Sequence, residues 1–230
     1  MHVLFDSSRW LVIAVVLLGG CTGGLAGHLP TWSFFAKEDN TTYVTPAKQI
    51  AKLQTLAEGA ASKSAAEQER IAVELARQIR NEQDPLLREQ IVRTAAHFTS
   101  PTADAVLGAA LQDRDTLVRL AAIEAIAGRG GSDAVQALSR LVENEGDIDV
   151  RLAAARALGD LQDPATTEAL VAALESPDPA LQYRAMQSLK STTGKDFGDD
   201  AEAWLQYARG ETPQAKPYSF VDSLKKLQPF

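Results

Sequence analysis

The sequence contains little cysteine and histidine, the residues that form disulfides and often form metal-binding or catalytic sites. Its 230 residues include one cysteine, so no internal disulfide can form. The three histidines, His2, His28 and His97, stand far apart in the sequence and form no pair. Because zinc sites and catalytic dyads need such groups close together, we expect no metal site, no cofactor and no enzymatic activity.

Positive charge is also scarce. The formal net charge is −7, from 23 Lys and Arg against 30 Asp and Glu. Proteins that bind nucleic acid depend on clustered Lys and Arg that displace counterions from phosphates. The sequence therefore argues against a nucleic-acid partner.

The N-terminal 20 residues have the layout of an export signal. Nine apolar residues from Trp10 to Leu18 are followed by Gly19 and Gly20. As a helix they would cover about 14 Å, roughly half of a bilayer core, so the run is too short to span it. An uncleaved anchor is the alternative, because no Asp, Glu, Lys or Arg occurs between Trp10 and Ala36. The glycines of this stretch and Pro30 favour cleavage followed by a tether at residues 21–45.

The residues Leu18-Gly19-Gly20-Cys21 resemble a bacterial lipobox. The resemblance implies that Cys21 is lipidated and becomes the N-terminus of the mature protein. Two or three acyl chains hold a protein firmly on a membrane. We therefore expect a lipid-anchored protein of the cell envelope, with its folded domain outside the cytoplasm.

The rest of the chain has the composition and the helix-start signals of an all-α protein. Segments of helical periodicity lie between places where an N-cap residue precedes proline, which is tolerated at the first helical position. These pairs are Thr45-Pro46, Asp84-Pro85, Ser100-Pro101, Asp163-Pro164 and Asp178-Pro179. No alternation typical of strands is present.

The helical segments repeat. Residues 118–127 (VRLAAIEAIA) and 150–159 (VRLAAARALG) match at six of ten positions with a shift of 32. Four aspartates at expected helix starts, Asp84, Asp115, Asp147 and Asp178, are separated by 31, 32 and 31 residues. Such periods indicate stacked helical hairpins.

The Asp-x-x-(Val/Leu)-Arg pattern over residues 64–191 resembles the HEAT-like repeats of bacterial proteins, a group that includes phycobilisome lyase subunits. The resemblance implies an α-solenoid of about four hairpins at residues 46–209, capped by residues 46–58 and 199–209. It also implies a structural ladder of Asp and Arg between repeats, although Gln182 replaces the last arginine. The matching residues are Asp84, Arg88, Asp115, Arg119, Asp147 and Arg151.

Binding to another protein is the function that this architecture favours. Positions five and nine after each aspartate are expected to face outward along a concave wall, where they would form a partner-binding groove. They are Leu120, Leu152 and Tyr183, beside Arg93, Glu124 and Arg156. The equally weighted alternative is that Leu120 and Leu152 pack between neighbouring repeats. Tyr183 is then the better candidate for contact with a partner.

The C-terminal tail, residues 210–230, differs from the body in its prolines and its excess of Lys and Arg over acids. Four apolar residues share one helical face beside Lys225 and Lys226: Phe220, Val221, Leu224 and Leu227. We expect this segment to dock on the acidic body, with a partner or anionic lipid as alternatives.

The sequence as a whole predicts a membrane-anchored scaffold for protein interaction in the bacterial cell envelope. The alternative is a lyase-like enzyme subunit, or a chaperone for a chromophore or modified protein, as the related lyase subunits suggest.

Overall fold

The computed structural model describes residues 44–161 and 163–213, and every regular element in these ranges is a helix. The all-α prediction is confirmed. The expected signal peptide, Cys21, most of the tether and residues 214–230 of the tail lie outside the described residues.

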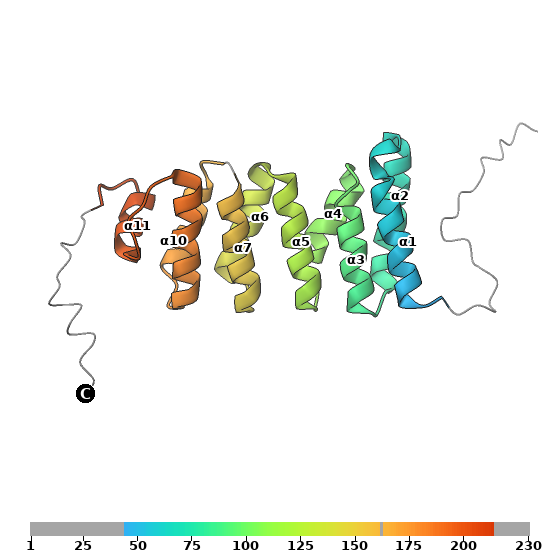
Figure 1. The fold of residues 1–230 in the computed structure, drawn as a ribbon, viewed down its shortest axis with the longest axis horizontal. Coiled ribbons are helices and arrows are strands. Elements are labelled where there is room, and N and C mark those ends of the chain that lie inside the picture. The colour runs from blue at the N-terminus through green and yellow to red at the C-terminus, as the bar shows by residue number, and fades with distance from the viewer. Residues whose placement is uncertain (1–43, 162, 214–230) are drawn as a thin grey trace, which may run out of the picture. The chain divides into compact units, whose positions relative to one another are not determined.

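The helices form two layers (Figure 1). In the first layer each helix packs on the next one in the series: α1 (Pro46–Glu58), α3 (Pro85–Ala95), α5 (Thr116–Arg129), α7 (Ile148–Asp160) and α10 (Pro179–Thr193). The second layer contains α2 (Ala65–Asn81), α4 (Pro101–Ala110), α6 (Gly131–Asn144), α8 (Thr166–Ala169), α9 (Val171–Leu174) and α11 (Ala201–Ala208). A 3₁₀ turn, η1 (Ala60–Ser62), joins α1 to α2.

Consecutive helices pair across the layers into hairpins. They are α2 with α3, α4 with α5, α6 with α7, and α8 and α9 with α10, while α1 and α11 close the two ends. The expected α-solenoid of about four hairpins with capping helices is therefore confirmed.

The repeated aspartates begin the first-layer helices. The carboxylates of Asp84, Asp115 and Asp147 each accept the backbone N–H two residues further on, at 2.9 to 3.0 Å. Asp178 accepts the N–H groups of Ala180 and Leu181. Each carboxylate satisfies a donor that has no partner inside the helix, which is why the aspartate spacing fixes the helix starts.

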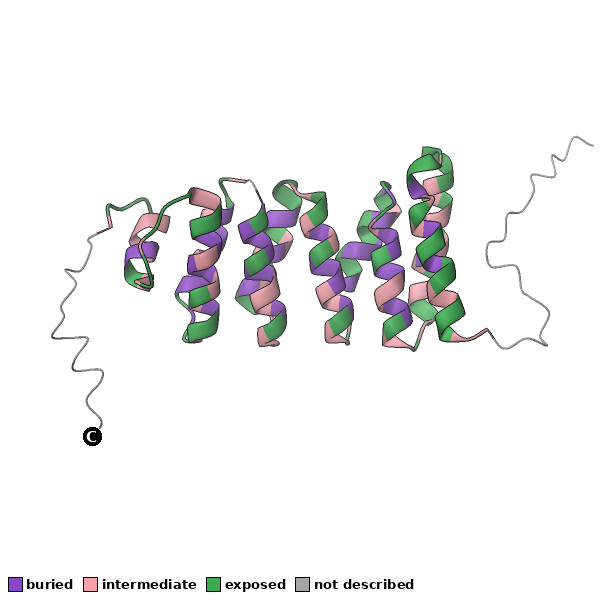
Figure 2. Ribbon diagram, in the orientation of Figure 1, coloured by how far each residue is buried: buried purple, intermediate pink, exposed green. Residues whose placement is uncertain are grey.

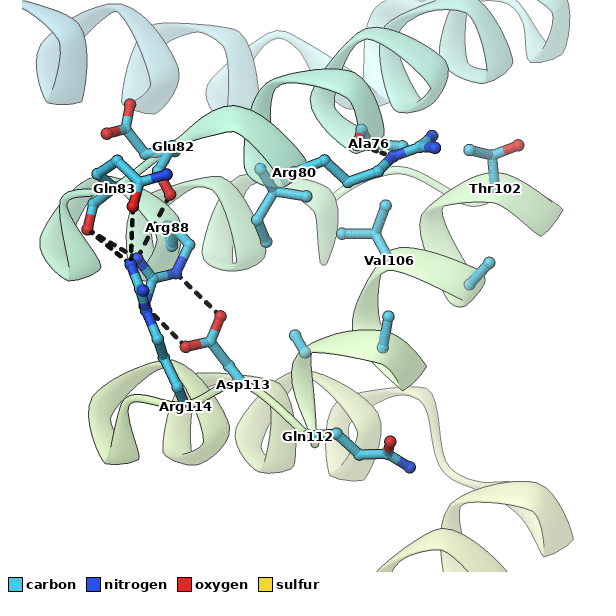
Figure 3. Close-up of a pocket in the computed structure, with 14 residues that line it drawn as sticks. Ala76, Arg80, Glu82, Gln83, Arg88, Thr102, Val106, Gln112, Asp113 and Arg114 are labelled. Carbon is cyan, nitrogen blue, oxygen red and sulfur yellow. Dashed lines mark hydrogen bonds and ion pairs between the residues drawn. The ribbon is translucent and has the colours of Figure 1, made fainter.

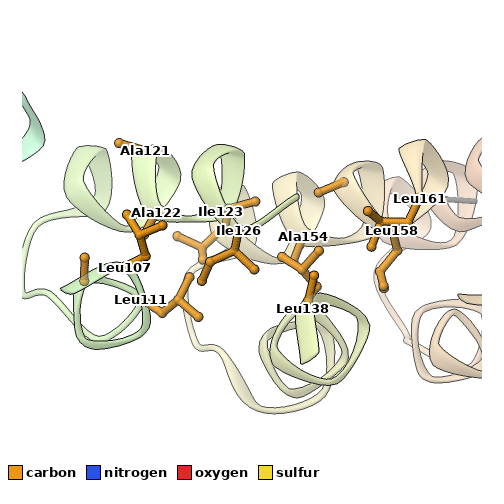
Figure 4. Close-up of a cluster of buried hydrophobic side chains, with 14 of the residues drawn as sticks. Leu107, Leu111, Ala121, Ala122, Ile123, Ile126, Leu138, Ala154, Leu158 and Leu161 are labelled. Atoms are coloured by element: carbon orange, nitrogen blue, oxygen red, sulfur yellow. The ribbon is translucent and has the colours of Figure 1, made fainter. Parts of the chain in front are cut away.

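The core runs through all hairpins instead of forming one central cluster (Figure 2). The residues three and seven positions after each aspartate are buried, as the periodicity predicts: Leu87, Val118, Val150, Leu181, Ile91, Ala122, Ala154 and Ala185. Figure 4 shows this core passing from Leu107 of α4 through Ile126 of α5 to Leu158 of α7. Each hairpin thus covers the apolar side of its neighbour.

The fourth hairpin departs from the sequence expectation. Asp163-Pro164 predicts a helix start, but the first helical residue is Thr166, whose hydroxyl donates to the Asp163 carbonyl at 2.7 Å. The helix is interrupted again at Leu170, whose carbonyl accepts from Ala173, three residues further on. The backbone bond between Ala173 and Leu170 is of the tighter 3₁₀ type and marks the break between the short helices α8 and α9.

Candidate functional site

The solvent-exposed side of the first layer holds the residues that the sequence suggests for partner binding. Positions two, five and nine after each N-cap aspartate fall within an arc of about 60° on an α-helix. This arc lies opposite the buried stripe of positions three, seven and ten. Four consecutive helices, α3, α5, α7 and α10, repeat the arrangement side by side.

Tyr183 is the most prominent of the predicted residues on this side. Its side chain on α10 leaves the residue 51% exposed, although it is a large aromatic. Leu120 and Leu152, at the same position of α5 and α7, are half-buried and pack against the hydrophobic core. Of the two roles open for these leucines, the geometry favours contact between repeats, with only an edge left for a partner.

Two exposed leucines were not among the predicted contact residues. Leu86 and Leu117 are 52% and 48% exposed, and each lies two residues after an N-cap aspartate. An apolar residue in the first turn but outside the buried stripe was the signal that could have identified them. The equivalent positions in α7 and α10 are Asp149 and Ala180. We call Leu86, Leu117 and Tyr183, with the exposed edges of Leu120 and Leu152, the apolar face.

The charged residues of the prediction lie beside the apolar face. Arg93 of α3 donates to Glu124 of α5 at 2.8 Å and to Glu89 of its own helix at 2.9 Å. Arg156 is exposed on α7. The structure therefore brings Arg93 and Glu124 together in an ion pair between two repeats.

Arg93 and Glu124 also line a hollow of about 540 Å³ between α1, α3 and α5. Its polar lining includes Glu58, Gln90 and His97, over a floor of alanines. The hollow extends the exposed side of the first layer toward α1.

The expected ladder of Asp and Arg takes three different forms. Arg119 donates to Asp147 at 3.0 Å and so joins α5 to α7. Arg88 instead holds Asp113, through two bonds of 2.8 and 2.9 Å. Arg151 donates to the backbone carbonyl of Val142 at 2.9 Å.

The remaining members of the ladder act locally. The Asp84 and Asp115 carboxylates cap their own helices. Gln182, which replaces the fourth arginine, donates to the Ser176 carbonyl at 2.8 Å. An amide therefore takes over the bond to the loop before the helix, without an ion pair.

Asp113 and Asp147, which accept bonds from Arg88 and Arg119, are both held in their charged form. Burial works to raise the pKa of Asp113, but the bond from Arg88, the N–H of Asp115 and the charge of Arg88 together lower it below its ordinary value. The pKa of Asp147 is lowered chiefly by the Thr116 hydroxyl, with a contribution from the charge of Arg119. Both carboxylates owe their lowered pKa to side chains and N–H groups of the same chain, which indicates structural roles.

No group of His, Cys, Asp and Glu residues suited to a metal ion occurs in residues 44–161 and 163–213. Within the same ranges, no helix has the length and apolarity needed to cross a bilayer. Cys21, the predicted lipidation site, lies outside the described residues.

The comparison with protein families agrees with the repeat architecture. The family model described as HEAT repeats matches residues 72–148 and 139–212. A search among curated proteins gave no match. The matched residues cover more than half of the sequence and coincide with the stacked hairpins, and the chain therefore belongs to the HEAT-repeat family.

Proposed function

We propose that this protein is a membrane-anchored scaffold of the bacterial cell envelope that binds a partner protein on its apolar face, without catalysis of its own. HEAT repeats generally serve as surfaces for protein interaction, because a stacked array exposes one long side of each layer. The proposal assigns that task to the first layer.

The exposure of Leu86, Leu117 and Tyr183 is the observation that carries the proposal. Burying a large apolar side chain against a partner contributes roughly 1.5–3 kcal/mol. Tyrosine is also among the residues that most often dominate an interface. The ion pair between Arg93 and Glu124 lies beside these residues and would form part of a polar rim.

The membrane anchor in this proposal is the lipid on Cys21. The short apolar run from Trp10 to Leu18 and the small residues before the cysteine support it. The anchor would hold the repeat array at a membrane surface of the envelope, where the array binds its partner.

The anchor is tested by the intact mass of the membrane-extracted protein. We expect a mature chain that begins at Cys21 and carries the additional mass of acyl chains. The Cys21→Ser variant should leave the membrane fraction. An unmodified chain that starts at Met1 and stays in the membrane would contradict lipidation and indicate an uncleaved membrane anchor.

The apolar face is tested by purifying the tagged protein from mildly solubilised membranes, where we expect one partner in stoichiometric amount. Tyr183→Ala combined with Leu117→Ala should remove the partner while the helical circular dichroism stays unchanged. Tyr183→Phe keeps the ring and should retain binding, and Gln136→Ala on the exposed side of α6 serves as a surface control. Absence of any partner, or equal recovery with the double variant, would disprove the proposal.

A further inference from the structure

The second layer contains a groove between α2 and α4 that the apolar face does not include. It has a volume of about 650 Å³ and is open to solvent (Figure 3). Its floor is apolar and consists mainly of small side chains: Ala76, Ile79, Ala105, Val106, Ala109 and Ala110. Because alanine ends at Cβ, the space between the two helices stays unfilled.

Two arginines flank this floor. Arg80 of α2 extends toward Thr102 in Figure 3, whereas Arg114 lies near Gln83 at another point of the groove. Arg80 donates to the backbone carbonyl of Ala76 at 3.0 Å, and Arg114 to the side chain of Gln83 at 3.2 Å. Both residues are exposed, and neither bonds to a carboxylate within residues 44–161 and 163–213.

The other charged groups of the lining are already engaged. Arg88 and Asp113 neutralise each other through their two bonds. The Glu82 carboxylate accepts the N–H of Asp84 at 2.9 Å but keeps its charge, which offsets one of the two remaining arginines. With three arginines against two carboxylates, the lining has a balance of +1, in a protein whose formal net charge is −7.

Two other hollows of the described chain have the opposite balance. The hollow between α6, α8, α9 and α11 has Glu143, Glu168 and Glu175 against one cation, Arg209. The hollow beside α1 has Glu58 and Glu124 against Arg93. The groove between α2 and α4 thus differs from them in the sign of the charge that it can receive.

We infer that this groove binds an acidic amphipathic helix of a partner protein. An open groove cannot enclose most of a small ligand, as small-molecule pockets do. It can receive a helix, because small residues let a third helix approach two others closely. The α4 lining from Thr102 to Ala110 extends about 12 Å at 1.5 Å per residue, which matches two to three turns. Apolar side chains of that helix would contact the alanine floor, and its carboxylates would pair with Arg80 and Arg114.

The inference is tested with two synthetic 15-residue helical peptides and the purified full chain. Both peptides carry the same Leu and Ala residues on one face, and their flanking positions are Glu in one and Lys in the other. At low salt, fluorescence anisotropy should show at least tenfold tighter binding of the Glu peptide. Its affinity should fall as salt is added, because exposed ion pairs are screened.

Charge-reversal variants locate the binding site. Arg80→Glu with Arg114→Glu should abolish the preference for the Glu peptide. The control, Arg140→Glu with Lys195→Glu, makes the same change in net charge at exposed positions outside the groove and should leave binding unchanged. Ala109→Trp should also weaken binding at least tenfold by filling the groove, with folding verified by circular dichroism.

Three outcomes would overturn the inference. The first is equal binding of the two peptides, and the second is an unchanged affinity after reversal of Arg80 and Arg114. The third is binding of phosphatidylglycerol vesicles that is lost in the same double variant while neither peptide binds, which would assign the groove to a lipid surface. None of these results depends on Leu117 or Tyr183, so failure here is distinguishable from failure of the proposed function.

Discussion

Arg88 and Arg93 lie on the same helix and each bonds to a carboxylate of the next repeat, but their surroundings differ. Arg88 is 4% exposed and meets Asp113 through two bonds. Arg93 meets Glu124 at the surface, where both side chains are about half exposed. Water and salt screen the second pair, whereas loss of one partner of the first leaves a poorly solvated charge.

We predict that Arg88→Ala lowers the free energy of unfolding by about 3 kcal/mol or more. Arg93→Ala, as the exposed control in the same helix, should cost less than about 1 kcal/mol. Chemical denaturation followed by circular dichroism measures both values. Similar losses in the two variants would show that burial does not set the strength of these contacts.

The carboxylate that each arginine meets depends on the tertiary structure. The resemblance to HEAT-like repeats implies bonds between Asp and Arg of neighbouring repeats, and the structure contains one of this kind, from Arg119 to Asp147. The resemblance does not indicate that Arg88 meets Asp113 instead of Asp115. Both aspartates follow α4 closely, and only the path of that loop decides which carboxylate faces the guanidinium.

At the scale of single helices, two glycines have opposite surroundings. Gly159 of α7 lies against α10, and a Cβ added there would come within 2.6 Å of the Ser188 side chain and 2.8 Å of its Cα. The Ser188 hydroxyl also donates to the Ala155 carbonyl of α7 at 2.8 Å. Gly108 of α4 is exposed, and a Cβ there would meet nothing within 4 Å.

Gly159→Ala is therefore expected to destabilise the protein by roughly 1–3 kcal/mol, because α7 and α10 would have to separate. Gly108→Ala should stabilise it by roughly 0.5–1 kcal/mol, since alanine has the higher helix propensity and lowers the entropy of the unfolded chain. Thermal unfolding of the two variants measures the difference. A gain in stability from Gly159→Ala would contradict the close approach of the two helices.

Helix starts were predicted well wherever one side chain decides them. An aspartate that accepts N–H groups of the first turn acts within a few residues, so the sequence alone locates α3, α5, α7 and α10. Asp163 accepts the N–H of Ala165 in the same manner, yet α8 begins later, at Thr166. There the Thr166 side chain and the packing of α8 and α9 on α6 prevail over the local signal.

At the scale of the whole array, each hairpin depends on its neighbours. Trp204 of α11 is fully buried and donates to the Gly198 carbonyl at 2.9 Å. Its ring packs against Phe197 with centroids 4.9 Å apart. This helix covers α9 and α10, which would otherwise expose the apolar side of the last hairpin.

We predict that Trp204→Ala removes about 3–5 kcal/mol of local stability from the C-terminal end. Contacts in a repeat array connect only adjacent units, so the loss should fade with distance. Hydrogen exchange should become faster in α9 and α10 and remain nearly unchanged in α1 and α2. Equal acceleration throughout would indicate a single cooperative unit and contradict the nearest-neighbour picture.

The sequence by itself determined the helical class, the number of hairpins, their order and the buried stripe of each first-layer helix. These features depend on capping and on periodicity within about 30 residues, which a linear sequence records directly. Only the tertiary structure decided that Leu120 and Leu152 pack against the core, which carboxylate Arg88 meets, and that α2 and α4 leave a groove between them. These depend on the spacing and tilt of neighbouring helices, which arise from the packing of many side chains at once.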